Sequence, residues 1–192
     1  MARALARTPI SPNQITWARL GFGIAAALAF AVGTSGAIYT GAALFVVSTF
    51  LDRADGELAR ASGRGSAWGH RFDLIADSIS NALAFVGIGI GAHVNGGFLG
   101  VWAIPAGVIA GLAVASILWL VMRAEAVAGP RAGELKPTAG FDPDDAMLVV
   151  PVALLFDLDD PLILAAAGAP AFAVHMYWTL RRRLKLLHLS GA

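Results

Sequence analysis

The stretch that decides the fold is residues 52–77, which read DRADGELARASGRGSAWGHRFDLIAD. It holds four aspartates in a chain that is 57% apolar and only 14% charged: Asp52, Asp55, Asp73 and Asp77. A charged carboxylate at the centre of a membrane helix costs roughly 2.5–3.5 kcal/mol on insertion scales. Four uncompensated carboxylates would cost about 10–14 kcal/mol, comparable with the net stability of a whole domain. Another group must neutralise this charge, and the identity of that group is the best guide to function.

The composition of the remaining chain favours an integral membrane protein. Its 192 residues suggest one domain, and the long apolar stretches recur too often for a soluble fold. The net charge of +1, without a basic stripe interleaved with aromatic residues, gives no support for a nucleic-acid partner. The absence of cysteine excludes both disulfides and a thiolate metal site.

The apolar segments predict an all-α, polytopic protein in which residues 1–192 form a single domain. A short interfacial helix is expected before residue 9, with Ser11 or Asn13 capping the helix that follows. The longest polar segment, residues 123–143, is expected to be a loop. Six membrane spans are predicted at about 15–32, 37–60, 69–92, 99–122, 145–157 and 162–180.

Lys and Arg predict the orientation of these spans. The loops near 33–36, 93–98 and 157–161 contain neither residue, and all fourteen Lys and Arg fall on the side of the termini. The positive-inside rule therefore places both termini and the 61–68 connection in the cytoplasm. Since the Ala- and Gly-rich composition suggests a bacterial genome, we expect a multi-pass protein of the bacterial cytoplasmic membrane. The aspartates then lie at the cytoplasmic interface.

Helical spacing sorts the motif into two matched faces. At 100° per residue, Asp52, Asp55, Gly56 and Ala59 share one stripe about 100° wide on the second predicted span. On the next span Gly69, Asp73 and Asp77 follow one another at steps of four residues. Each helix thus presents two carboxylates beside residues with little or no side chain.

Carboxylate oxygens without nearby cysteine suit a hard cation, so Mg²⁺ or Mn²⁺ is expected in preference to zinc. Two such ions would balance the four carboxylates and form the usual clamp for in-line phosphoryl displacement. Gly56, Ala59 and Gly69 would let a nucleotide or pyrophosphate approach the backbone. Arg60 is positioned one turn beyond Gly56 to meet a phosphate oxygen.

Three other interpretations compete with this one. The aspartates would do no chemistry if they simply paired with Arg53, Arg60, Arg64 and Arg71. Two matched stripes with small residues between them disfavour that view. A cation or proton transporter would use the carboxylates as an ion path, but they lie near one interface and the other spans offer almost no polar route. A non-catalytic scaffold is disfavoured because the motif is unbroken.

The spacing D-x2-D-G-x2-A-R-x8-G-x3-D-x3-D resembles the signature of the CDP-alcohol phosphotransferase (CDP-alcohol phosphatidyltransferase) family, class I. Residues 52–77 match it at every specified position, and the Pro12–Arg19 stretch, Pro-Asn-x-Ile-Thr-x-x-Arg, is also similar to the family. The resemblance implies a six-helix membrane fold, a homodimer, and CDP-linked alcohol substrates used with Mg²⁺ or Mn²⁺.

The resemblance also implies roles for individual residues. Asp52, Asp55 and Asp73 would be metal ligands, and Asp77 would be the general base and also touch metal. The nucleotide would be contacted by Gly56, Ala59, Arg60 and Gly69. Asp77 would take the proton from an acceptor hydroxyl. The resulting alkoxide would attack the phosphorus that bears the donor alcohol, and CMP would leave.

The acceptor is less clearly specified by the sequence. A phosphorylated acceptor such as glycerol phosphate or inositol phosphate needs cations, for which Arg19, Arg123, Arg131 and Lys136 are candidates. The alternative explanation for each of these residues is that it sets the membrane topology or contacts a lipid headgroup. Residues 141–145 are expected to cap the fifth span, with polyol recognition as the alternative. The favoured donor is CDP-diacylglycerol, and the alternative is a CDP-linked head group given to a lipid or polyol.

Overall fold

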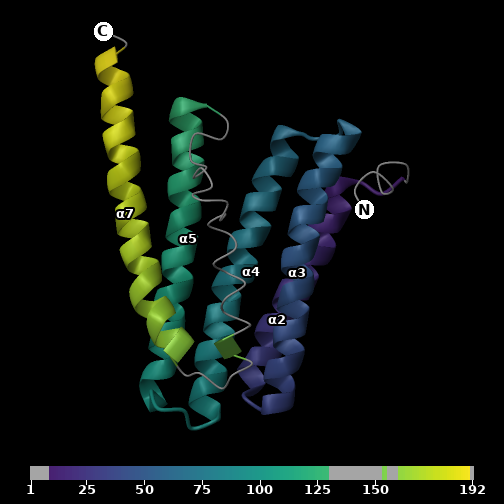
Figure 1. Ribbon diagram of the computed structural model, residues 1–192, viewed down its shortest axis with the longest axis vertical. Coiled ribbons are helices and arrows are strands. Elements are labelled where there is room, and N and C mark those ends of the chain that lie inside the picture. Colours follow the sequence, from purple (N-terminus) through teal and green to yellow (C-terminus); the bar gives the residue numbers. More distant parts are fainter. Residues whose placement is uncertain (1–8, 130–152, 155–159, 191–192) are drawn as a thin grey trace.

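Long helices account for nearly all of the part of the chain that the computed structural model describes, namely residues 9–129, 153–154 and 160–190. Five of the described helices are long and apolar enough to cross a membrane. The helices are α2 (Pro12–Val32), α3 (Ser35–Ser62), α4 (Ala67–Val94), α5 (Ala103–Ala128) and α7 (Asp160–Ser190), with a 3₁₀ turn η1 (Gly100–Trp102) before α5 (Figure 1). The predicted all-α class and the membrane-length helices are confirmed.

Two parts of the sequence prediction fall largely outside the described residues. The fifth predicted span, 145–157, is described only at Ala153 and Leu154, whose backbone is helical. The predicted interfacial helix before residue 9 is likewise outside them. The six-span count and the N-terminal helix therefore remain predictions.

Local chemistry sets the helix ends around the motif. Ser11 caps α2 through a capping box, in which its hydroxyl accepts from the Gln14 amide and the Gln14 side chain accepts from the Ser11 amide. Gly63 ends α3 in the left-handed conformation, with φ of 66°. The Ser66 hydroxyl then caps α4 by accepting from the Gly69 amide at 2.9 Å. Four residues, 63–66, separate α3 from α4, so the two acidic helices follow one another in the chain and run antiparallel.

Two helices extend further than the hydropathy predicts. α5 continues past residue 122 to Ala128, because the polar residues there are good helix formers, and it stops before Gly129, whose φ is 91°. Arg123 and Glu125 consequently lie on a helix and not in the predicted loop. α7 likewise continues beyond residue 180 to Ser190.

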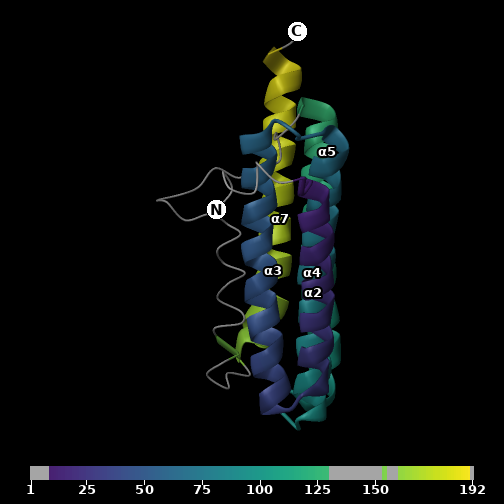
Figure 2. The ribbon, with the colours of Figure 1, turned by 90° about the vertical axis from the view of Figure 1, so that its right-hand side faces the viewer.

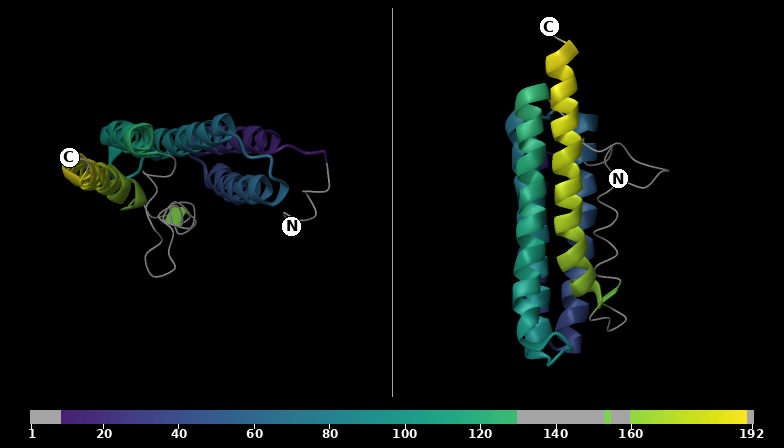
Figure 3. Two further views of the ribbon diagram at one scale, coloured as in Figure 1. Left: turned by 90° about the horizontal axis from the view of Figure 1, so that it is seen from above. Right: turned by 90° about the vertical axis from the view of Figure 1, so that its left-hand side faces the viewer.

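Three of the described helices form a layer, and two more helices pack on one face of it. α4 packs between α2 and α5, while α3 packs on α2 and α7 packs on α5. Figures 2 and 3 show α3 and α7 on the same side of the α2–α4–α5 layer. α2 and α4 begin, and α3, α5 and α7 end, at one end of the bundle (Figure 1). The described Lys and Arg residues all lie in the helix halves nearest that end or, in the case of Arg64, in the connection between α3 and α4 there; we call this end the basic end.

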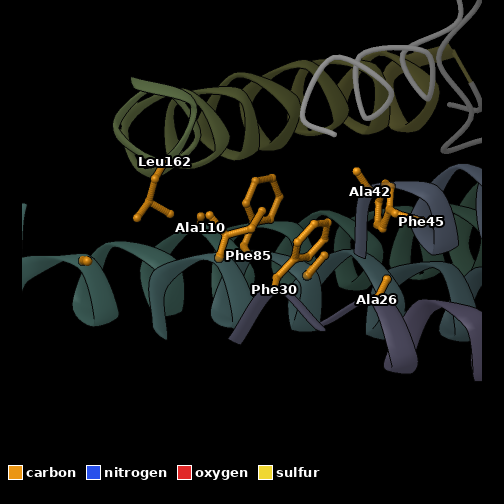
Figure 4. Packing of buried hydrophobic residues seen from close by; sticks show 10 residues of the cluster. Ala26, Phe30, Ala42, Phe45, Phe85, Ala110 and Leu162 are labelled. Atoms are coloured by element: carbon orange, nitrogen blue, oxygen red, sulfur yellow. The ribbon is translucent and has the colours of Figure 1, made fainter. Parts of the chain in front are cut away.

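The core combines large aromatic side chains with small ones. Phe30, Phe45 and Phe85 are buried and pack among alanines from four helices (Figure 4). Close approach of α4 to α2 depends on Gly87 and Gly91, where an added Cβ would overlap the carbonyl oxygens of Ala27 and Phe30. This tight contact fixes α2 against α4 and so sets the position of the motif's second half.

Candidate metal and nucleotide site

Three aspartates converge at the basic end from two helices. Asp52 and Asp55 of α3 and Asp73 of α4 each offer a carboxylate oxygen, and these oxygens all lie within 4.8 Å of one another. The predicted stripes therefore do face one another. Asp77 lies one turn further along α4 and joins the group through a shared contact with Arg19.

The donor set fits a divalent cation. All three converging ligands are carboxylate oxygens, which Mg²⁺ and Mn²⁺ prefer. Asp73 Oδ1 is buried and accepts no hydrogen bond from any residue in the described part of the chain. Arg19 Nη2 lies 3.2 Å from this oxygen without a hydrogen bond, so the oxygen keeps acceptor capacity that a metal ion would meet.

Arg19 of α2 occupies the centre of the acidic group, with a side chain only 1% exposed. Its guanidinium pairs with Asp52, and Nη2 lies 3.2 Å from Asp73 Oδ1. Nη1 lies 3.7 Å from Asp77 Oδ1. Nη2 also donates to the backbone carbonyl of Asp73 at 2.6 Å. The sequence suggested Arg19 as an acceptor-binding cation, whereas the structure places it among the predicted metal ligands.

Two polar side chains that the sequence analysis missed orient the aspartates. The Thr16 hydroxyl donates to Asp55 Oδ2 at 2.7 Å, and the Asn81 amide donates to Asp77 Oδ1 at 3.1 Å. Asn81 was detectable in principle, because it lies four residues after Asp77 on the same helix face. Thr16 belongs to the Pro12–Arg19 stretch, but its partner Asp55 is 39 positions away, so helical spacing could not pair the two residues.

The small residues of the motif, Gly56, Ala59 and Gly69, each lie within four positions of an aspartate on the same helix. A Cβ added at Gly56 would lie 3.5 Å from Arg60 Nη1, so the Arg60 guanidinium extends beside this glycine. A Cβ added at Gly69 would lie 3.0 Å from Asn13 Oδ1. Ala59 is half-buried on the stripe that carries Asp52 and Asp55. The arrangement leaves backbone and a guanidinium beside the acidic group, as a nucleotide diphosphate would require.

Of the other three acceptor candidates, only Arg123 lies in the described residues. Arg123 is exposed on α5, with its guanidinium 5.4 Å from the centre of the Trp119 ring. Arg131, Lys136 and the 141–145 segment lie outside the described residues. A pair that the sequence analysis did not predict joins α4 to α5 nearby, where His70 Nε2 lies 3.0 Å from Glu125 Oε1.

Fold and site together define a class: a polytopic helical membrane protein with an acidic cluster suited to divalent cations. The sequence matches the CDP-alcohol phosphatidyltransferase family over residues 9–179, which is most of the chain. The chain therefore belongs to this family of transferases, as the motif predicted.

Curated relatives match about half of this chain. The phosphatidylinositol phosphate synthase of Cutibacterium acnes is 32% identical over 90 residues, 47% of this chain and 42% of that protein. The archaetidylinositol phosphate synthase of Pyrococcus horikoshii is 36% identical over 95 residues, 50% of this chain and 49% of that protein. A bifunctional IPC transferase and DIPP synthase of Rubrobacter xylanophilus is 38% identical over 85 residues, 44% of this chain and 19% of that protein. The chain thus spans half or less of the length of these relatives.

Solved structures share the fold over nearly the whole chain. The phosphatidylinositol phosphate synthase of Mycobacterium tuberculosis with CDP-DAG bound has a TM-score of 0.66 and 24% identity, covering 96% of this chain and 89% of that one. The same enzyme in complex with manganese and citrate also gives a TM-score of 0.66, at 23% identity, and covers 96% of this chain and 85% of that one. At these identities the likeness shows the fold alone.

Proposed function

We propose that this chain transfers a phosphatidyl group from CDP-diacylglycerol to a hydroxyl of inositol phosphate, releasing CMP, in phospholipid synthesis. The observation that carries the proposal is the convergence of Asp52, Asp55 and Asp73 within 4.8 Å, beside glycines and Arg60. Family membership supports the reaction class. The names of the Cutibacterium and Pyrococcus relatives support inositol phosphate over glycerol phosphate as the acceptor.

The proposed setting is a single six-span domain over residues 1–192 that begins with a short interfacial helix. It lies in a bacterial cytoplasmic membrane and functions as a homodimer. The grouping of described Lys and Arg at the basic end supports a cytoplasmic location for the termini and the site. A site at that interface is accessible both to a soluble acceptor and to a lipid donor.

In the proposed site Asp52, Asp55, Asp73 and Asp77 would hold two Mg²⁺ or Mn²⁺ ions. When bound, these ions would neutralise the diphosphate and the charge that develops on departing CMP. Gly56, Ala59 and Gly69 would let the diphosphate lie against the backbone, where Arg60 would meet a phosphate oxygen. This assignment gives the otherwise costly carboxylates the compensating charge that the apolar chain demands.

The proposed chemistry uses Asp77 as the general base. Its carboxylate would remove the proton from the acceptor hydroxyl, and the oxygen would then form a bond to the phosphorus that carries diacylglycerol. The bond between that phosphorus and the bridging oxygen of CMP would break, so CMP leaves with the electron pair. Asn81 would keep the Asp77 carboxylate oriented through its 3.1 Å hydrogen bond.

A phosphorylated acceptor would need cations on the cytoplasmic side. Arg123, Arg131 and Lys136 are proposed for this role on charge and position in the chain. Of these three, the described structure contains only Arg123, whose guanidinium lies 5.4 Å from the centre of the Trp119 ring.

A panel of donors and acceptors tests the proposal. The purified protein in lipid vesicles would be given CDP-diacylglycerol with inositol phosphate, inositol or glycerol phosphate, and the lipid product identified by mass spectrometry. We expect phosphatidylinositol phosphate as the main product. Activity only with CDP-inositol or another CDP-linked head group would reverse the donor assignment.

A further inference from the structure

We propose that Arg19 is a resident counter-charge of the acidic cluster: a positioning residue that holds Asp52, Asp73 and Asp77 in place whether or not cations are bound. This inference extends the proposed metal site and rests on it for the presence of cations. It assigns to Arg19 a role in the site's assembly, and it removes Arg19 from the candidates for binding a soluble acceptor.

The burial of Arg19 excludes a direct role toward a soluble substrate. Its side chain is 1% exposed and is among the largest fully buried side chains in the described residues. A guanidinium so deeply buried is tolerated only where anionic partners surround it. Asp52, Asp73 and Asp77, on two different helices, provide those partners.

Two backbone contacts hold Arg19 independently of the carboxylates. Nη2 donates to the Asp73 carbonyl oxygen at 2.6 Å, and the Ser48 hydroxyl of α3 donates to the Arg19 carbonyl oxygen at 3.0 Å. Neither partner is a carboxylate that a cation would engage. Arg19 therefore has a reason to remain in position when cations enter, and it is more than a substitute for the metal.

The charges favour the same conclusion. The four aspartates with Arg19 carry a net formal charge of three negative units, which leaves an attractive site for divalent cations. Without Arg19 the cluster would hold four carboxylates with no buried cation among them. The metal-free protein would then bear repulsion between α3 and α4 that bound metal would relieve.

Thermal unfolding of the full-length protein in detergent tests this assignment. The wild type would be compared with Arg19→Met, Arg19→Lys and the Arg19→Met/Asp52→Asn double variant, each in EDTA and in saturating Mn²⁺. Arg71→Met is the matched control, since Arg71 is an exposed arginine on the same end of the bundle. Mn²⁺ binding to the wild type, followed by electron paramagnetic resonance, tests the metal site separately.

We expect Arg19→Met to lower the unfolding temperature in EDTA by roughly 10 °C, and by a smaller but still measurable amount in Mn²⁺, because the cations then supply part of the missing counter-charge. Arg19→Lys should recover part of the loss, and adding Asp52→Asn should recover part of it without metal. Purification of Arg19→Met only in the presence of Mn²⁺ would support the same role. Equal losses in EDTA and Mn²⁺ with no recovery in the double variant would overturn it, as would an unaffected unfolding temperature. A wild type that binds no Mn²⁺ would instead remove the proposed metal site, while the EDTA series would still test the counter-charge.

Discussion

Thr16 of α2 donates a hydrogen bond of 2.7 Å to the carboxylate of Asp55 of α3, which lies 39 positions later in the chain. Thr16 itself is buried and Asp55 is only 3% exposed, so this bond forms in a largely water-free setting. α2 thus fixes a carboxylate of α3. α2 is part of the site, although the acidic motif lies wholly outside it.

Replacing Thr16 with valine should weaken divalent-cation binding by about 10–100-fold, because partners that orient a metal ligand typically contribute that much. Valine keeps the shape of the side chain but cannot donate to Asp55. A Mn²⁺ titration followed by electron paramagnetic resonance would measure the change. Thr40→Val is the matched control, since the Thr40 hydroxyl donates only to Gly36 within its own helix. Equal affinities for the wild type and Thr16→Val would show that Asp55 needs no such orientation.

Asp77→Asn should leave the protein folded and lower the rate of CMP release at least about 100-fold, the usual scale for losing a general base. The substitution keeps the side-chain volume but removes its basicity. Initial rates of CMP formation, normalised to folded protein by gel filtration, would measure the effect. Turnover like that of the wild type would remove Asp77 from the role of base.

Gly91→Ala should destabilise the protein by about 1–3 kcal/mol, because the new Cβ overlaps the carbonyl oxygen of Phe30 and forces α4 away from α2. The unfolding temperature in detergent would report the loss. Gly21→Ala is the control, since a Cβ there meets nothing within 4 Å. Indistinguishable behaviour of the two variants would contradict the close α2–α4 contact.

The His70–Glu125 pair should couple the beginning of α4 to the end of α5. His70 Nε2 and Glu125 Oε1 are 3.0 Å apart and partly buried. A double-mutant cycle with His70→Ala and Glu125→Ala should give a coupling energy of about 0.5–3 kcal/mol in unfolding experiments, as for other residues in contact. Strict additivity of the two single losses would show that the pair does not tie the helices together.

Hydropathy and helical spacing, which act within one helix, were enough to predict part of this fold and site. The runs of apolar residues predicted the described helices. The three-residue spacing of Asp52 and Asp55 and the four-residue spacing of Asp73 and Asp77 predicted one acidic face on each of two helices. The extension of α5 to Ala128 was missed because hydropathy falls at Arg123 while helix propensity does not.

The contribution of α2 could not be predicted by the same reasoning. Burial of Arg19 between three aspartates depends on how α2 packs against α3 and α4, which the periodicity of one helix does not specify. An arginine one turn beyond a threonine near a membrane interface also satisfies the positive-inside rule. Only the packed structure distinguishes a buried counter-ion from a residue that sets topology.

The most direct test of the proposed activity is CMP release from CDP-diacylglycerol by the purified protein in lipid vesicles. Reactions with inositol phosphate would be compared in Mn²⁺ and in EDTA, with Asp73→Asn alongside the wild type. We predict CMP release only by the wild type with both acceptor and Mn²⁺, matched mole for mole by new phospholipid. A folded, Mn²⁺-binding wild type that releases no CMP from any CDP-alcohol, or releases it equally in EDTA, would contradict the proposed phosphotransferase.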